Sequence, residues 1–106
     1  MSKVVQFQPR IPSILRIIRE VVQDSSRIRL GPAIQAEFAT GLISFRQVMN
    51  GLQKGQISIG PYPDDYGMTC CELELITAGR WVRVVVSIEG KTPNGRILHV
   101  LFAEEI

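Results

Sequence analysis

The chain is short of the residues that build metal centres, disulfide frameworks and membrane spans. Its 106 residues include one histidine and two cysteines, and the two cysteines are adjacent. So few soft ligands exclude a zinc module, and one adjacent pair cannot staple a disulfide scaffold. No apolar run approaches the roughly 20 residues of a transmembrane helix, and the first residues lack a secretory layout. We therefore expect no metal, no cofactor and no membrane partner, and the cysteines favour a reducing, cytoplasmic location.

Motifs of the common catalytic folds are also missing. The sequence has no P-loop, no GxGxxG after a strand and no nucleophile elbow. His99 is the only histidine, so it is the only possible partner for Cys70 as a catalytic Cys–His nucleophile. Asp64-Asp65 offers oxygen ligands for a divalent cation, but such a pair in a Pro- and Gly-rich segment is typical of a turn.

Charge is distributed unevenly along the chain. The net charge is +2, with +4 on residues 1–30 and −2 on residues 31–106. Nine of the twelve basic residues are arginine, whose guanidinium forks onto carboxylate or phosphate. Two interpretations of the basic segment stay open. It is an anion-binding surface that includes Arg16 and Arg19, or it is the solvated face of an amphipathic helix.

The first half of the chain has the pattern of helices. Residues 1–10 show no firm pattern and are expected to form a loose tail, followed by a single domain over 11–106. Apolar residues recur at helical spacing over 12–23, which predicts the first helix. Gly31-Pro32 and Gly41 mark the start and end of a second, shorter one.

A third helix is predicted from its start signal. Ser44 followed by Gln47 fits the capping box, in which each side chain bonds the other residue's backbone N–H. Ile43 and Val48 fit the hydrophobic staple, and Gly55 ends the helix. An inward face is expected to carry Phe45, Val48, Met49 and Leu52.

Everything after Gly55 has the pattern of β-strands. A short alternating segment is followed by turn-forming residues at 60–67, and longer strands are expected at 68–77, 80–89 and 96–103. The connections between these three are too short for a parallel crossover, so they should form an antiparallel meander. We expect an α+β fold, with N-terminal helices packed on one face of a three- to four-stranded antiparallel sheet.

The strand period of two separates an apolar face from a mixed face. The apolar face is expected to carry Cys71, Leu73, Leu75, Val82, Val84, Val86, Ile88, Leu98, Val100 and Phe102. The mixed face should carry Glu72, Glu74, Ile76, Trp81, Arg83, Val85, Ser87, Glu89, Ile97, His99 and Leu101. A tight turn at Ala78-Gly79 would place Glu74 opposite Arg83 and Ile76 opposite Trp81, and aligned core faces would place Ser87 near His99.

The mixed face gathers the groups best suited to chemistry. His99 can exchange protons near neutral pH, Arg83 can hold a phosphate, and Glu74 would orient Arg83. Further binding residues are expected at Trp81, Ser87, Arg96, Tyr66, Arg16 and Arg19. The alternative is a half-exposed sheet with a cross-strand ion pair, on which Ile76 and Trp81 form a cover or an interface.

Several short segments also occur in a characteristic order. They are Gly41-Leu42-Ile43-Ser44-Phe45-Arg46-Gln47-Val48-Met49-Asn50-Gly51-Leu52, Lys54-Gly55-Gln56-Ile57, Tyr62-Pro63-Asp64-Asp65, Trp81-Val82-Arg83-Val84-Val85-Val86 and Ile97-Leu98-His99-Val100. Over residues 32–104 this order resembles a bacterial family of small domains of unknown function, related in pattern to the BrnT-like and RelE-like toxin ribonucleases.

The resemblance implies helices packed on a curved antiparallel sheet and a metal-independent endoribonuclease, or a degenerate relative of one. Arg83 stands where the family often has a histidine in its Val-rich strand. The implied partners are RNA and an antitoxin-like protein. The alternative function is a non-catalytic protein-interaction domain or homodimer module, which uses the mixed face or helix 12–23.

Overall fold

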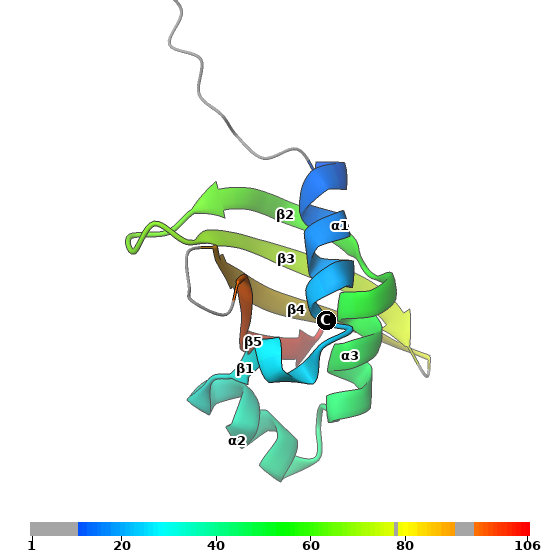
Figure 1. Cartoon of the computed structure of the whole chain (residues 1–106). Helices are drawn as coiled ribbons and strands as arrows, with labels where there is room; N and C mark the ends of the chain where they lie inside the picture. The colour runs from blue at the N-terminus through cyan, green and yellow to red at the C-terminus, as the bar shows by residue number, and fades with distance from the viewer. Residues whose placement is uncertain (1–10, 78, 91–94) are drawn as a thin grey trace, which may run out of the picture.

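Helices occupy the first half of the chain and most of the sheet follows them (Figure 1). The structure is a computed structural model that describes residues 11–77, 79–90 and 95–106, so the tail expected at 1–10 lies outside the described residues. The helices are α1 (Ile11–Val21), α2 (Pro32–Thr40) and α3 (Phe45–Lys54), with a 3-10 turn η1 (Ser25–Arg27). The strands are β1 (Ile28–Leu30), β2 (Gln56–Pro63), β3 (Thr69–Thr77), β4 (Arg80–Glu89) and β5 (Ile97–Glu105).

The three predicted helices are confirmed, together with the signals that bound them. Ser44 Oγ accepts a hydrogen bond from Gln47 N, and Gln47 Oε1 accepts one from Ser44 N, which completes the capping box of α3. Gly41 ends α2 in the left-handed conformation with φ of 77°. Of the expected inward residues of α3, Phe45 is the exception, because it is half exposed and meets Phe38 edge to face.

The sheet has five strands in the order β1-β5-β4-β3-β2. Strands β2 to β5 form an antiparallel meander, as the connections predicted, but β1 pairs with β5 in parallel. The expected three- to four-stranded antiparallel sheet is therefore a five-stranded mixed sheet. Strand β1 was not predicted, because its three residues are too few to show an alternating pattern.

Strand β2 is longer than predicted, because it continues to Pro63, into the first half of the segment 60–67 that was expected to be a turn. The turn itself is confined to residues 64–67. Proline is tolerated there since β2 is an edge strand and its outer side needs no ladder hydrogen bond. Gly60 has φ of +96°, and a Cβ at this position would lie 2.9 Å from Cys70 O. Glycine is thus required at this position, because a side chain on Gly60 would meet the backbone of β3.

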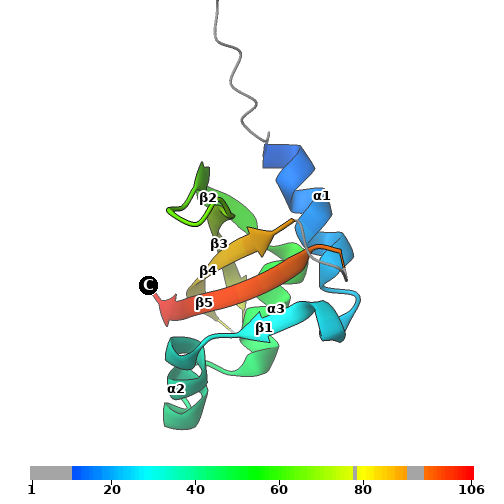
Figure 2. The same ribbon diagram turned by 60° about the vertical axis from the view of Figure 1, so that its left-hand side comes forward.

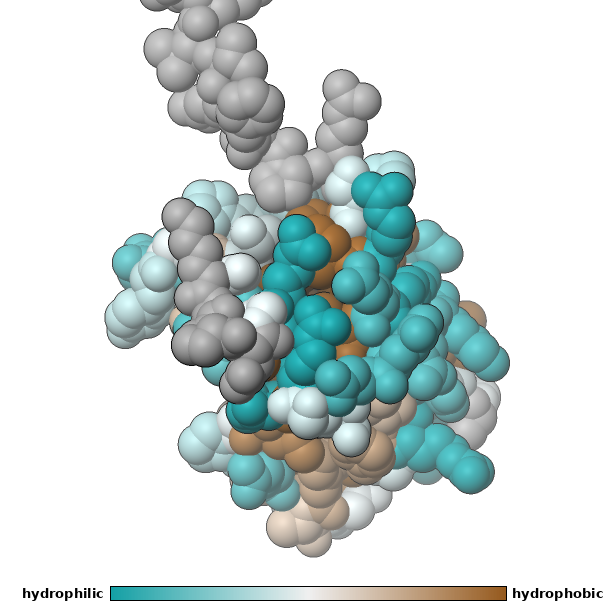
Figure 3. Space-filling model, viewed as in Figure 1, coloured by the Kyte–Doolittle hydropathy of each residue, from teal (hydrophilic) through white to brown (hydrophobic). Residues whose placement is uncertain are grey.

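The helices α1 and α3 pack on one face of the sheet and enclose the core (Figures 1 and 2). The core takes buried residues from both layers: Ile14, Ile18, Val21, Ile34, Val48, Leu52, Cys71, Leu73, Val82, Val84, Val86, Ile88, Leu98, Val100 and Ala103. From the helix side, hydrophilic side chains cover much of the surface, and apolar ones gather lower down over α2 (Figure 3). Among the described residues, no helix is both long and apolar enough to cross a membrane.

One face assignment in β5 is wrong. The register passes from Val86 opposite Val100 to Val85 opposite Phe102, so Leu101 is an extra residue, a β-bulge. The bulge reverses the alternation, which moves Phe102 to the opposite face and puts Ala103 in the core. We call the sheet face opposite α1 and α3 the outer face; it carries Glu72, Glu74, Ile76, Trp81, Arg83, Ser87, Glu89, His99, Phe102 and Glu104.

Candidate functional site

The outer face holds two polar clusters on different parts of the sheet. Glu74 lies opposite Arg83 and Ser87 lies opposite His99, as the sequence predicted. Ser87 lies four positions after Arg83 on β4, which corresponds to roughly 13 Å at the rise of an extended strand. The structure therefore brings Glu74 to Arg83 but keeps both away from His99, and the expected three-residue catalytic group is not assembled.

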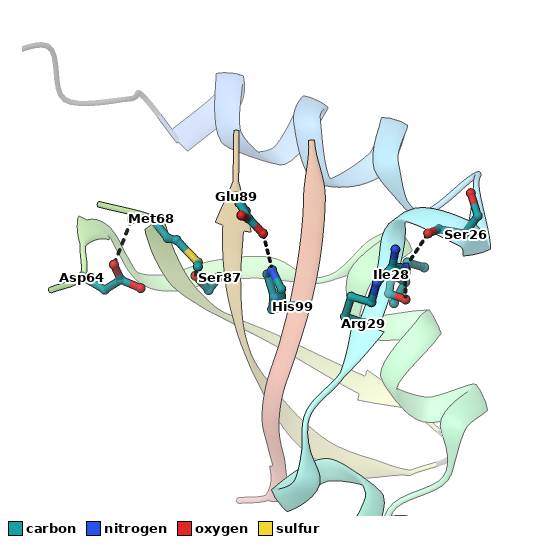
Figure 4. A network of polar contacts seen from close by, with 8 residues as sticks. All are labelled: Ser26, Ile28, Arg29, Asp64, Met68, Ser87, Glu89 and His99. Carbon is teal, nitrogen blue, oxygen red and sulfur yellow. Dashed lines mark hydrogen bonds and ion pairs between the residues drawn. The ribbon is translucent and has the colours of Figure 1, made fainter. Parts of the chain in front are cut away.

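The first cluster is a hydrogen-bonded pair of His99 on β5 and Glu89 at the end of β4 (Figure 4). His99 Nε2 lies 2.9 Å from Glu89 Oε1, and the histidine side chain is 29% exposed. An ionised carboxylate only accepts hydrogen bonds, so Nε2 carries the proton and Nδ1 is left to exchange one. We call His99 and Glu89 the histidine cluster.

A cavity of about 500 Å³ adjoins this cluster, because Glu89 is also part of the cavity wall. The cavity lies between α1 and the ends of β3, β4 and β5, and apolar side chains of Ile14, Ile17, Met68 and Ile88 form part of its lining. Its polar lining includes Ser13, Tyr66, Glu89 and Arg96. Two residues expected at the site from sequence, Tyr66 and Arg96, are therefore brought together.

The turn that carries Tyr66 is held by Asp64. Asp64 Oδ1 accepts hydrogen bonds from the backbone N–H groups of Tyr66 and Met68, both at 2.8 Å. Figure 4 shows the one from Met68. Partial burial raises the pKa of this carboxyl, but these hydrogen bonds and one from Cys70 outweigh it and hold the pKa below its ordinary value. Asp64 therefore shapes the turn, and in the described part of the chain no group of three acidic, histidine or cysteine side chains is arranged to hold a metal.

Two further candidates are buried. Ser87 is almost fully buried, and its Oγ lies 3.2 Å from Met68 Sδ (Figure 4). Burial raises the pKa of the Cys70 thiol, with smaller contributions from Asp64 in the same direction. Cys70 is thus a neutral thiol at physiological pH, which argues against the Cys–His nucleophile.

Most of the described arginines of the N-terminal basic segment donate hydrogen bonds to backbone carbonyls and so hold the fold together. Arg19 donates to the carbonyls of Leu52 and Gly55, at 2.9 and 2.8 Å, whereas Arg16 is exposed on α1. Arg27 Nε donates to Arg96 O at 3.0 Å, so η1 is tied to the start of β5 beside the cavity.

Arg29 is opposite His99 in the parallel register, but its guanidinium donates to the carbonyls of Ser26 and Ile28 (Figure 4). Sequence reasoning missed this neighbour because it missed β1. The role of Glu89 as the partner of His99 was also missed, although both were assigned to the mixed face.

The second cluster surrounds Arg83 with three glutamates. Arg83 lies 3.4 Å from Glu72, 3.7 Å from Glu74 and 3.2 Å from Glu104 at the nearest charged atoms. Three carboxylates more than offset one guanidinium, so Arg83 offers no net positive charge to a phosphate. We call these four residues the arginine cluster, and the expected phosphate-holding role of Arg83 is not supported.

An apolar row borders the arginine cluster. Ile76 pairs with Trp81 across β3 and β4, and Ile106 N donates to Trp81 O at 2.8 Å on the other side. Trp81, expected to bind near the catalytic group, therefore lies at the end of the outer face away from His99.

Comparison with known proteins adds no relative. No family model, no curated protein and no solved structure matches this chain. What the two clusters can do chemically follows from their own geometry.

Proposed function

We propose that the protein is a metal-independent endoribonuclease whose active site is the histidine cluster with the adjoining cavity. The observation that carries the proposal is the 2.9 Å pair of His99 and Glu89, in which Glu89 also lines a cavity with Tyr66 and Arg96. Glu89 thus links a proton carrier, His99, to a cavity whose lining includes a cation, Arg96, and an aromatic ring, Tyr66. The resemblance to the toxin ribonucleases over residues 32–104 favours the same reaction.

Cleavage of RNA at this site needs only proton transfer and stabilisation of charge. His99 takes the proton of a ribose 2′-hydroxyl, and the 2′ oxygen attacks the adjacent phosphorus. The bond from phosphorus to the 5′ oxygen breaks, and the imidazolium returns a proton to that oxygen. The products are a 2′,3′-cyclic phosphate and a 5′-hydroxyl. Glu89 acts through His99 as a positioning residue, since it fixes the tautomer and stabilises the imidazolium.

The cavity supplies the contacts for the nucleotide. Arg96 contributes the positive charge for the phosphate, replacing the role first assigned to Arg83. Tyr66 is 87% exposed and offers a ring on which a base can stack. The apolar lining from Ile14 and Ile17 accommodates the rest of the base.

The test is cleavage of a mixed-sequence, end-labelled RNA oligonucleotide with EDTA present throughout. We expect wild-type protein to release fragments that end in a 2′,3′-cyclic phosphate. His99→Ala should slow cleavage by about a hundredfold or more, the size of a lost acid–base group. Glu89→Gln should slow it less and shift the pH–rate profile, and Arg96→Ala should raise KM.

The matched control is Arg46→Ala, which removes an exposed arginine of α3 outside the cavity lining. Its rate should equal that of the wild type, and the DNA oligonucleotide of the same sequence should stay intact because it lacks the 2′-hydroxyl. Circular dichroism confirms that each variant is folded. Absence of cleavage by folded wild-type protein, or equal rates for wild type and His99→Ala, would refute the proposal.

A further inference from the structure

We infer that the other end of the outer face is a docking surface for an amphipathic helix of a partner protein, with lysine or arginine along one flank. The surface consists of the apolar row, Ile76, Trp81 and Ile106, together with the arginine cluster. It stands apart from the histidine cluster, so the inference does not depend on the proposed ribonuclease activity.

The apolar row is unusually exposed for such large side chains. Ile76 is 70% exposed, Trp81 50% and Ile106 49%. They lie in one row across three neighbouring chain segments, because Trp81 of β4 pairs with Ile76 of β3 and its carbonyl accepts a hydrogen bond from the N–H of Ile106, the residue after β5. Large apolar side chains that are grouped in this way mark an interaction site more often than isolated ones do.

The charge next to the row specifies the partner. The carboxylates of Glu72, Glu74 and Glu104 surround the single guanidinium of Arg83, which leaves an excess of two negative charges. The cluster is thus electrostatically incomplete, and a partner cation complements it.

The spacing of the row fits a helix that crosses the strands. Three adjacent strands span roughly 10 Å at about 4.8 Å per strand. Residues i and i+7 of an α-helix are separated by about 10.5 Å along its axis. Apolar residues at i, i+3 or i+4, and i+7 can therefore meet Ile76, Trp81 and Ile106 in turn.

The same orientation places the basic flank. Successive side chains on one face of a strand are roughly 7 Å apart, which is the distance from the apolar row to the Glu74–Arg83–Glu104 row. Basic residues on that flank of the docked helix reach the glutamates with ordinary lysine or arginine side chains. A helix with an acidic flank would meet like charge there.

The test uses two synthetic helical peptides that lack tryptophan. Both carry leucine at i, i+3, i+4 and i+7; one has lysine along a flank of this stripe and its twin has glutamate there. Trp81 is the only tryptophan of the chain, so its fluorescence reports binding at the row itself. We expect the lysine peptide to shift the tryptophan fluorescence until the signal saturates. The glutamate peptide should bind at least roughly tenfold more weakly.

Variants separate the two parts of the surface. Ile76→Ser should weaken binding of the lysine peptide, and Glu74→Gln combined with Glu104→Gln should weaken it and reduce its salt dependence. The matched control is Glu20→Gln, an exposed glutamate of α1, which should bind as the wild type does.

Three results would overturn the inference. The first is no saturable response to the lysine peptide, and the second is equal affinity for the two peptides. The third is a concentration-dependent dimer in sedimentation that Ile76→Ser abolishes, because a second copy of the chain would then cover the row. RNA cleavage measured on the same variants should be unchanged, so failure here and failure of the proposed ribonuclease are distinguishable.

Discussion

Cys71 shows how strongly a single buried group can couple stability to pH. Its side chain is fully buried in the core, and burial raises the pKa of its thiol to about 12 from an ordinary value of 9.0. Between those pH values the unfolded chain loses the thiol proton and the folded chain keeps it. Stability should therefore fall as pH rises from about 9 to 12, at up to about 1.4 kcal/mol per pH unit from this group. Urea unfolding between pH 8 and 11 measures the slope.

The control for Cys71 is Cys71→Ala. This variant should be less stable at pH 8, because it leaves a small gap in the core, but its stability should decline less steeply with pH. Other groups titrate in the same range, so the difference between the two slopes is the quantity that reports Cys71. Parallel slopes for wild type and variant would contradict the prediction. Iodoacetamide at pH 7.5 should also leave the folded wild-type thiol at this position unmodified.

At the scale of elements, the start of α3 depends on the capping box. Ser44→Ala removes the acceptor for Gln47 N and should lower the free energy of unfolding by about 1 kcal/mol. Urea denaturation followed by circular dichroism measures the loss. Ser25→Ala is the matched control, because Ser25 is exposed and its hydroxyl makes no hydrogen bond to the described residues. An equal loss in both variants would show that the cap contributes nothing specific.

The elements also show which features a sequence alone can predict. The helix bounds depend on local signals such as Ser44 and Gly41, and the β3–β4 register follows from a two-residue connection and the apolar alternation. Strand β1 and the bulge at Leu101 depend on pairing with residues distant in the sequence, so no local sequence pattern predicts them. The separation of His99 from Arg83 is predictable, because aligned core faces already place His99 beside Ser87 and not beside Arg83. The surplus of carboxylates around Arg83 is not predictable, because it includes Glu104, whose face is set by the bulge.

At the scale of the whole molecule, Arg19 ties α1 to the rest of the fold. Its guanidinium donates hydrogen bonds to the carbonyls of Leu52, in the last turn of α3, and of Gly55, the residue before β2. The apolar side of α1 packs on the sheet. Partial burial lowers the pKa of Arg19 from its very high ordinary value, yet the group stays charged at neutral pH. One side chain thus joins the first helix to the junction where the chain passes from helices to sheet.

Arg19→Met keeps the apolar stem of this side chain and removes both hydrogen bonds, so it isolates their contribution. We expect the free energy of unfolding to fall by about 1–3 kcal/mol, since two carbonyls lose a charged donor. The melting temperature should drop by roughly 4–8 °C for each kcal/mol in a domain of this size. Arg19→Lys should recover part of the loss, because one ammonium reaches a single carbonyl at a time. The matched control is Arg16→Met, because Arg16 is an exposed arginine of the same helix, and it should change the melting temperature little. Equal effects at the two positions would rule out a specific role for Arg19 in holding α1.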